Sequence, residues 1–125
     1  MPLRTRRWSA PALPDDGFRL LVTRYRPRGI AKADETWDAW WPELGPSREL
    51  LAAFKGTDGG DGLAWSSYEA RYFDEMARQS FRIRALASRL GAGESITLLC
   101  SSSCHDPARC HRTLLASILT AAAAR

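Results

Sequence analysis

All five cysteine and histidine residues of this chain lie in one short window, positions 100–111. The window reads Cys-Ser-Ser-Ser-Cys-His-Asp-Pro-Ala-Arg-Cys-His. Thiols and imidazoles are the side chains best suited to nucleophilic attack, proton transfer and soft-metal binding near neutral pH. We therefore expect the chemistry of this protein to be located here.

Cys110 and His111 are the predicted catalytic residues of this window. They fall in the first turns of a helix predicted to begin at Asp106-Pro107, an N-cap followed by proline. A helix N-terminus stabilises anions, which favours the Cys110 thiolate and leaves His111 neutral and able to accept a proton. The competing interpretation is structural, since Cys110 also begins the apolar face of that helix. Cys100 ends a predicted strand and is interpreted as a buried apolar side chain.

A metal site is the second interpretation of the same window. Thiolate with imidazole suits zinc or another soft metal, and the ligands would be Cys104, His105, Cys110 and His111. The spacing matches neither a zinc knuckle nor the paired Cys-x2-Cys of ribbons and fingers. The sequence requires no cofactor, and a thiol redox sensor is the related alternative.

A second motif, Arg-Tyr-Arg-Pro-Arg-Gly at positions 24–29, follows a predicted strand. Guanidinium groups match phosphate and carboxylate, and open α/β sheets bind ligands beyond the carboxyl ends of their strands. If this strand and the one ending at Cys100 are parallel, both following loops open at the same edge. The predicted ligand is an anionic small molecule or nucleic acid, and its predicted binding residues are Arg24, Arg26, Arg28, Gly29 and Arg112. The alternative is a solvated arginine run.

The elements that must position these motifs are those of an α/β protein. Residue patterns predict strands over 3–8, 18–24 and 95–100, and helices over 47–54, over 63–90 with a break near 79–80, and from 106 onward. Residues 37–41 are ambiguous between a strand and a helical turn. The prediction is a single small three-layer domain over residues 1–125, with a mainly parallel sheet flanked by helices and a flexible loop at 55–62.

Composition places the chain among globular proteins, with 45% hydrophobic and 26% charged residues and a net charge of +4. No apolar run is long enough to predict a membrane span, and no membrane partner is expected. The basic N-terminus lacks the apolar stretch of a signal peptide. We expect a cytoplasmic protein with reduced thiols, and the odd number of cysteines argues against a disulfide framework.

The chain resembles the YeaO-like proteins, short bacterial members of the family of domain of unknown function 488, over nearly its whole length. The matching segments are Pro14–Gly17, Arg24 with Pro27–Gly29, the Trp41–Leu50 region, aromatic residues near Trp65 and Tyr72, and Cys110–Arg112. The resemblance implies an α/β fold of Rossmann-like character and an unassigned activity. It also implies that Arg24, Arg28, Cys110, His111 and Arg112 form one site. Two positions depart from the family pattern: Thr23 replaces an aspartate and Arg26 a tryptophan.

The function predicted from these observations is an anion pocket at the C-terminal edge of the sheet, for a nucleotide or nucleic-acid fragment. Cys110 would be its nucleophile or redox thiol and His111 the acid–base partner. A non-catalytic nucleic-acid-binding module is the alternative, with affinity that falls linearly with log salt and does not depend on Cys110. The sequence does not decide between the anion pocket, the nucleic-acid-binding module and a metal-binding or redox-sensing domain.

Overall fold

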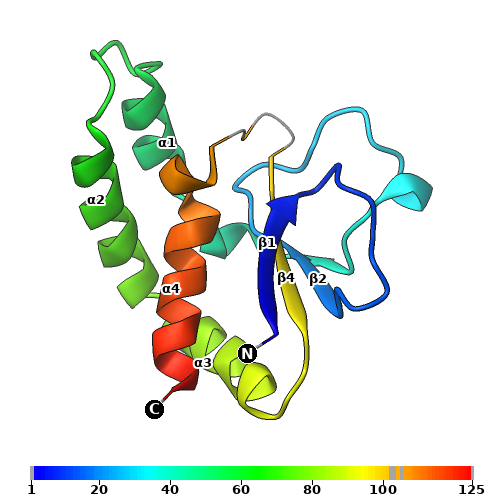
Figure 1. Cartoon of the computed structure of the whole chain (residues 1–125). Coiled ribbons are helices and arrows are strands. Elements are labelled where there is room, and N and C mark those ends of the chain that lie inside the picture. Colours follow the sequence, from blue (N-terminus) through cyan, green and yellow to red (C-terminus); the bar gives the residue numbers. More distant parts are fainter. Residues whose placement is uncertain (1, 102–103, 105, 125) are drawn as a thin grey trace.

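The sheet of this protein is parallel and carries its helices on one face (Figure 1). The computed structural model describes residues 2–101, 104 and 106–124. Within these, the strands lie in the order β1-β4-β2-β3 and every pairing is parallel. Their bounds are β1 Leu3–Arg7, β2 Phe18–Leu21, β3 Ala39–Trp40 and β4 Ile96–Cys100. The predicted α/β class with a parallel sheet is confirmed, and the ambiguous segment 37–41 contains the short edge strand β3.

The helices are α1 Arg48–Lys55, α2 Trp65–Ala77, α3 Ser80–Gly91 and α4 His111–Ala123. Ser47 caps α1, because its hydroxyl accepts a hydrogen bond from the Leu50 N–H at 3.1 Å. The break between α2 and α3 lies at residues 78–79, as predicted. None of the helices in the described part of the chain combines the length and apolar character needed to cross a bilayer.

The predicted start of the last helix, at Asp106, is wrong by several residues. Asp106 does act as a cap, since its carboxylate accepts from the Ala108 N–H at 3.0 Å, but it caps a 3₁₀ turn over Pro107–Arg109. Cys110 is extended, with φ −134° and ψ 138°, and separates that turn from α4. Cys110 is therefore the N-cap residue of α4, and His111 is its first helical residue.

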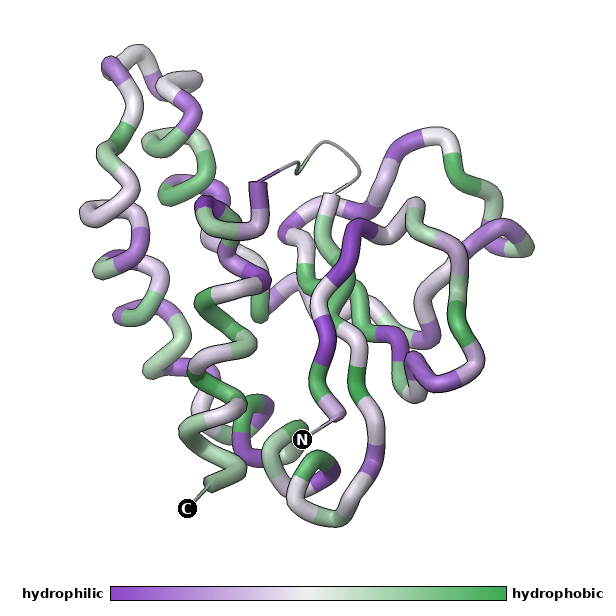
Figure 2. Tube along the Cα trace, in the orientation of Figure 1, coloured by the Kyte–Doolittle hydropathy of each residue, from purple (hydrophilic) through white to green (hydrophobic). Residues whose placement is uncertain are grey.

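The two faces of the sheet are covered differently, and the alternation of side chains along β4 shows how. Ile96 and Leu98 belong to the large core formed with all four helices. Leu99 points to the other face, where it packs with Leu21 and Trp37 in a smaller cluster covered by loop segments. Because successive strand residues face opposite sides, Cys100 shares the helix-facing side with Leu98. In Figure 2 β4 and α4 carry much of the green, apolar trace, whereas β1 is largely purple.

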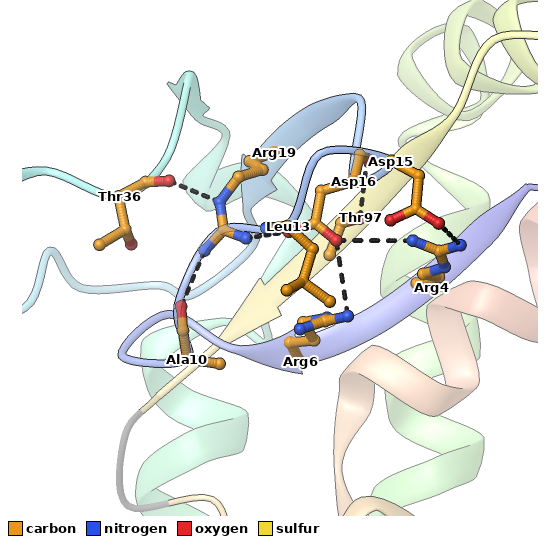
Figure 3. Close-up of polar contacts among 9 residues, drawn as sticks. All are labelled: Arg4, Arg6, Ala10, Leu13, Asp15, Asp16, Arg19, Thr36 and Thr97. Atoms are coloured by element: carbon orange, nitrogen blue, oxygen red, sulfur yellow. Dashed lines mark hydrogen bonds and ion pairs between the residues drawn. The ribbon is translucent and has the colours of Figure 1, made fainter.

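A buried ion pair ties the loop between β1 and β2 to the sheet (Figure 3). Asp16 and Arg19 are both buried and paired with each other. The Arg19 Nε also donates to the Thr36 carbonyl at 2.6 Å, and the Thr97 hydroxyl donates to the Asp16 carbonyl at 2.8 Å. Thr97 lies near the start of β4, at the opposite end of that strand from Cys100. This network therefore supports the fold at the edge remote from the thiols.

Gly17 makes the tight connection from that loop into β2. Its φ is +66°, which other residues rarely adopt, and a Cβ placed there would lie 2.2 Å from the Ser95 carbonyl oxygen. The loop approaches the chain just before β4 only because position 17 has no side chain.

Candidate functional site

A cavity of about 540 Å³ opens where the C-terminal ends of β1, β2 and β4 meet. Its size is typical of small-molecule sites. The loop after β2 and the start of α4 both contribute to its wall, with α1 and α2 supplying further residues. Of the residues predicted for the site, those lining the cavity are Arg24, Arg26, Arg28, Cys104, Cys110 and His111. The structure thus brings the arginine motif and the cysteine–histidine motif to one cavity.

Two of the lining arginines already have protein partners. Arg24 donates from Nε to the Pro46 carbonyl at 2.9 Å and from Nη2 to the Gly45 carbonyl at 3.3 Å. Arg26 is paired with Glu35, with Nη2 at 2.8 Å from the carboxylate. These contacts fix the loop after β2 against the segments that precede β3 and α1. Both arginines have lost part of their donor capacity to the protein itself.

Three other cations line the cavity with their donors unpaired: Arg28, Lys55 and Arg109. All three are exposed, and none of these side chains makes a hydrogen bond or ion pair with another described residue. Among the described residues, no aspartate or glutamate lines the cavity. A concave surface with cations and no carboxylate attracts anions. The sequence prediction did not include Lys55 or Arg109 among the ligand-binding residues.

Two residues predicted for ligand binding do not line the cavity. Gly29 forms the turn beyond Arg28 with a φ of +73°. Arg112 is buried, and its Nε has no hydrogen-bond partner among the described residues. Neighbouring residues of a helix point about 100° apart, so Arg112 cannot share the direction of His111. His105, predicted for the metal set, lies outside the described residues.

The three thiols form one cluster. The Sγ atoms of Cys100 and Cys110 are 3.1 Å apart, and those of Cys100, Cys104 and Cys110 all lie within 4.8 Å of one another. Cys100 and Cys110 are only 3% and 4% exposed, whereas Cys104 is partly exposed. Cys100 is buried as predicted, but its contact with Cys110 was missed. The signal that could have found it is strand alternation, which turns Cys100 toward the helices.

His111 is held by the main chain at the end of β2. Its Nε2 lies 2.7 Å from the Val22 carbonyl oxygen, which can only accept, so Nε2 donates. His111 is also one of the groups that lower the pKa of the neighbouring Cys110 thiol. Tyr72 packs against the imidazole, with ring centroids 5.7 Å apart. With Nε2 engaged by the Val22 carbonyl, Nδ1 is the ring nitrogen left without a hydrogen bond to another described residue.

The thiols of the cluster differ in pKa. The pKa of Cys110 is lowered far below that of an ordinary thiol, chiefly by the hydrogen bond with Cys100 and further by His111, against the opposing effect of burial. The pKa of Cys100 is raised by its hydrogen bonds with Cys104 and Cys110 and by burial. The pKa of Cys104 is lowered as well, chiefly by its hydrogen bond with Cys100. Cys110, whose pKa falls to about 3, is the principal thiolate of the cluster, and Cys100 keeps its proton.

The same thiols are the groups that can hold a soft metal. Their mutual separations suit ligands around one thiophilic ion, and thiolates favour zinc or copper(I). The cluster found among the described residues adds Cys100 to the predicted Cys104 and Cys110 and does not include His111.

Fold and cavity together define a small α/β protein that has cysteines, a histidine and unpaired cations around one cavity at the C-terminal edge of its parallel sheet. The chain belongs to the DUF488 family: residues 3–123 match the family model DUF488-N3a, described as the active DUF488-N3 subclade. The family predicted from the sequence is thereby confirmed.

Curated relatives extend this similarity over most of the chain. The chain is 34% identical over 102 residues to the uncharacterised protein YeaO of Escherichia coli (strain K12), and the match covers 82% of this chain and 84% of YeaO. It is 32% identical over 111 residues to the uncharacterised protein Rv3073c of Mycobacterium tuberculosis (strain ATCC 25618 / H37Rv), covering 85% of this chain and 83% of that protein. No solved structure matches the chain significantly.

Proposed function

We propose that this protein binds a phosphate-bearing ligand of nucleotide type in the cavity, and that the Cys110 thiolate is the nucleophile that acts on it. The observation that carries the proposal is the joint presence, in one cavity, of unpaired cations and a thiol of lowered pKa. The family model's description as an active subclade agrees with a catalytic role.

The cations divide into two kinds in this proposal. Arg28, Lys55 and Arg109 supply free donors for the phosphate. Arg24 and Arg26 hold the loop that presents Arg28, through their contacts with main-chain carbonyls and with a glutamate. They are positioning residues.

Aromatic residues in the wall support a nucleotide over a bare phosphate. Trp8, Tyr25, Phe54 and Tyr68 line the cavity, and Tyr25 is 52% exposed. A nucleobase can stack on such rings, with a gain of about 1–3 kcal/mol per base. A cavity of about 540 Å³ has room for a ligand larger than phosphate.

His111 completes the reactive pair. Its Nε2 is engaged by the Val22 carbonyl, which leaves Nδ1 as the nitrogen that can exchange a proton with Cys110. In this role it accepts the Cys110 proton during the reaction and returns it to the leaving group. A cytoplasmic location is part of the proposal, because three reduced thiols at one site require a reducing compartment.

Calorimetric titration with AMP, and with adenosine as the ligand without phosphate, tests the proposal. Removing a charge-assisted hydrogen bond costs about 1.5–3 kcal/mol, so Arg28→Ala should weaken AMP binding about 10- to 150-fold. The wild-type affinity for AMP should fall as salt is added. Adenosine should bind more weakly and be unaffected by Arg28→Ala.

Arg84→Ala is the matched control, since Arg84 is an exposed arginine of α3 that does not line the cavity. It should bind AMP as the wild type does. AMP affinity unchanged in both Arg28→Ala and Arg109→Ala would overturn the anion site.

A further inference from the structure

Two thiols that line the cavity, those of Cys100 and Cys110, are in contact at 3.1 Å between Sγ atoms. We propose that these two cysteines are a redox-active pair: hydrogen peroxide oxidises Cys110, and Cys100 then closes a reversible disulfide with it. The proposed disulfide is a covalent modification of Cys110. That it would switch off activity rests on the proposed function, in which Cys110 is the nucleophile.

The positions of the two residues in the fold allow the bond to form. A disulfide has an S–S distance of about 2.05 Å, so the sulfurs must approach by about 1 Å. Cys100 is the last residue of β4, and Cys110 lies in extended conformation between a 3₁₀ turn and α4. Both are at the ends of their elements, where small side-chain rotations need not disturb a helix or the sheet ladder.

In the proposed reaction Cys110 is oxidised first, and the adjacent Cys100 then closes the bond. The Cys110 thiolate attacks one peroxide oxygen, the O–O bond breaks, and the departing hydroxide takes a proton to become water, leaving a sulfenic acid on Cys110. Cys100 then attacks the Cys110 sulfur. The S–S bond forms, the S–O bond breaks, and the leaving hydroxide takes the Cys100 proton as a second water. Two thiols and one peroxide thus give one disulfide and two waters.

The oxidant reaches the two thiols through the cavity, and so does the thiol that reduces the disulfide. Cys100 and Cys110 are almost fully buried but line the cavity wall, which hydrogen peroxide is small enough to reach. Reduction consumes two equivalents of an external thiol, which becomes a disulfide as both cysteines regain their protons. While the bond is closed, Cys110 has no thiolate and cannot act on a ligand.

Cys104 is the competing partner, because its Sγ lies within 4.8 Å of the other two. Trypsin cleavage after Arg89, Arg109 and Arg112 separates the alternatives. It leaves Cys100 and Cys104 in one peptide, Leu90–Arg109, and Cys110 in another, Cys110–Arg112. A disulfide to Cys110 therefore joins two peptides, whereas a Cys100–Cys104 bond stays within one.

The experiment oxidises the full-length protein with hydrogen peroxide, alkylates the remaining thiols and maps unreduced tryptic peptides. The wild type and Cys104→Ser should both give the joined peptides, and dithiothreitol should separate them. Cys100→Ser/Cys104→Ser should give no joined peptides and accumulate sulfinic acid on Cys110. Circular dichroism verifies that each variant is folded.

Three results would overturn the inference. One is a joined peptide that disappears in Cys104→Ser, which assigns the bond to Cys104. Another is an unlinked sulfinic Cys110 in the wild type. The third is a stoichiometric bound metal that protects all three thiols. The peptide-mapping experiment contains no AMP. Its result therefore does not depend on whether the protein binds a nucleotide, and failure of the disulfide proposal can be told apart from failure of the proposed function.

Discussion

Replacing Cys100 by alanine removes the main cause of the lowered Cys110 pKa, the hydrogen bond between the two sulfurs. A hydrogen bond to a charged group contributes about 1.5–3 kcal/mol, and one pKa unit corresponds to about 1.4 kcal/mol. Cys100→Ala should therefore raise the pKa of Cys110 by about 1–2. Cys100→Ser keeps a hydroxyl donor in the same place and should raise it less.

The assay is the rate of alkylation by iodoacetamide as a function of pH, since only the thiolate reacts. A Cys104→Ser background removes the more exposed thiol. An ordinary thiol is only about 0.3% ionised near pH 6, and its rate rises about tenfold per pH unit. Cys110 should instead react at a nearly constant rate above its own lowered pKa, with the midpoint displaced upward in the alanine variant. The same midpoint in the alanine variant and its parent, or an ordinary thiol profile in the parent, would refute the reasoning.

Two further perturbations test how the fold supports the site. Asp16→Asn leaves the buried Arg19 without its carboxylate and should cost about 3–5 kcal/mol of unfolding free energy, measured by urea denaturation. Burial raises the pKa of Asp16, but its hydrogen bonds and the charges of Arg6 and Arg19 together lower it by more. The wild-type stabilisation is therefore complete above the ordinary carboxyl range and lost as pH falls through the lowered value, a dependence absent from the variant. Gly45→Ala would place a Cβ 2.6 Å from the Arg24 amide nitrogen, so it should cost about 1–3 kcal/mol and weaken AMP binding by displacing the loop after β2. Unchanged stability in Asp16→Asn, or unchanged stability and AMP affinity in Gly45→Ala, would contradict these accounts.

The meeting of the arginine and cysteine–histidine motifs at one cavity could be predicted from the sequence, because it depends on local patterns and one rule of topology. Cysteine and histidine concentrate in one window, and parallel strands bring the loops after β2 and β4 to one edge. That rule suffices to place Arg28 near Cys110. The Cys100 contact was also within reach, since strand alternation turns that residue toward α4.

Sequence patterns could not predict which long side chains pair with residues far away in the sequence. Nothing local shows that Arg26 is matched by Glu35, or that Arg24 is occupied by carbonyls before α1. Lys55 reaches the cavity because α1 packs beside α2 over the sheet edge, which depends on tertiary packing. The start of α4 was misplaced because a capping residue followed by proline begins a 3₁₀ turn as readily as an α-helix.

The most direct test of the central claim, that the cations and the thiolate form one site, is protection of Cys110 from alkylation by AMP in the Cys104→Ser background. The account predicts that AMP slows alkylation in a saturable way and that Arg28→Ala shifts this protection to higher AMP concentrations. Alkylation of Cys110 at an unchanged rate in protein saturated with AMP would contradict it.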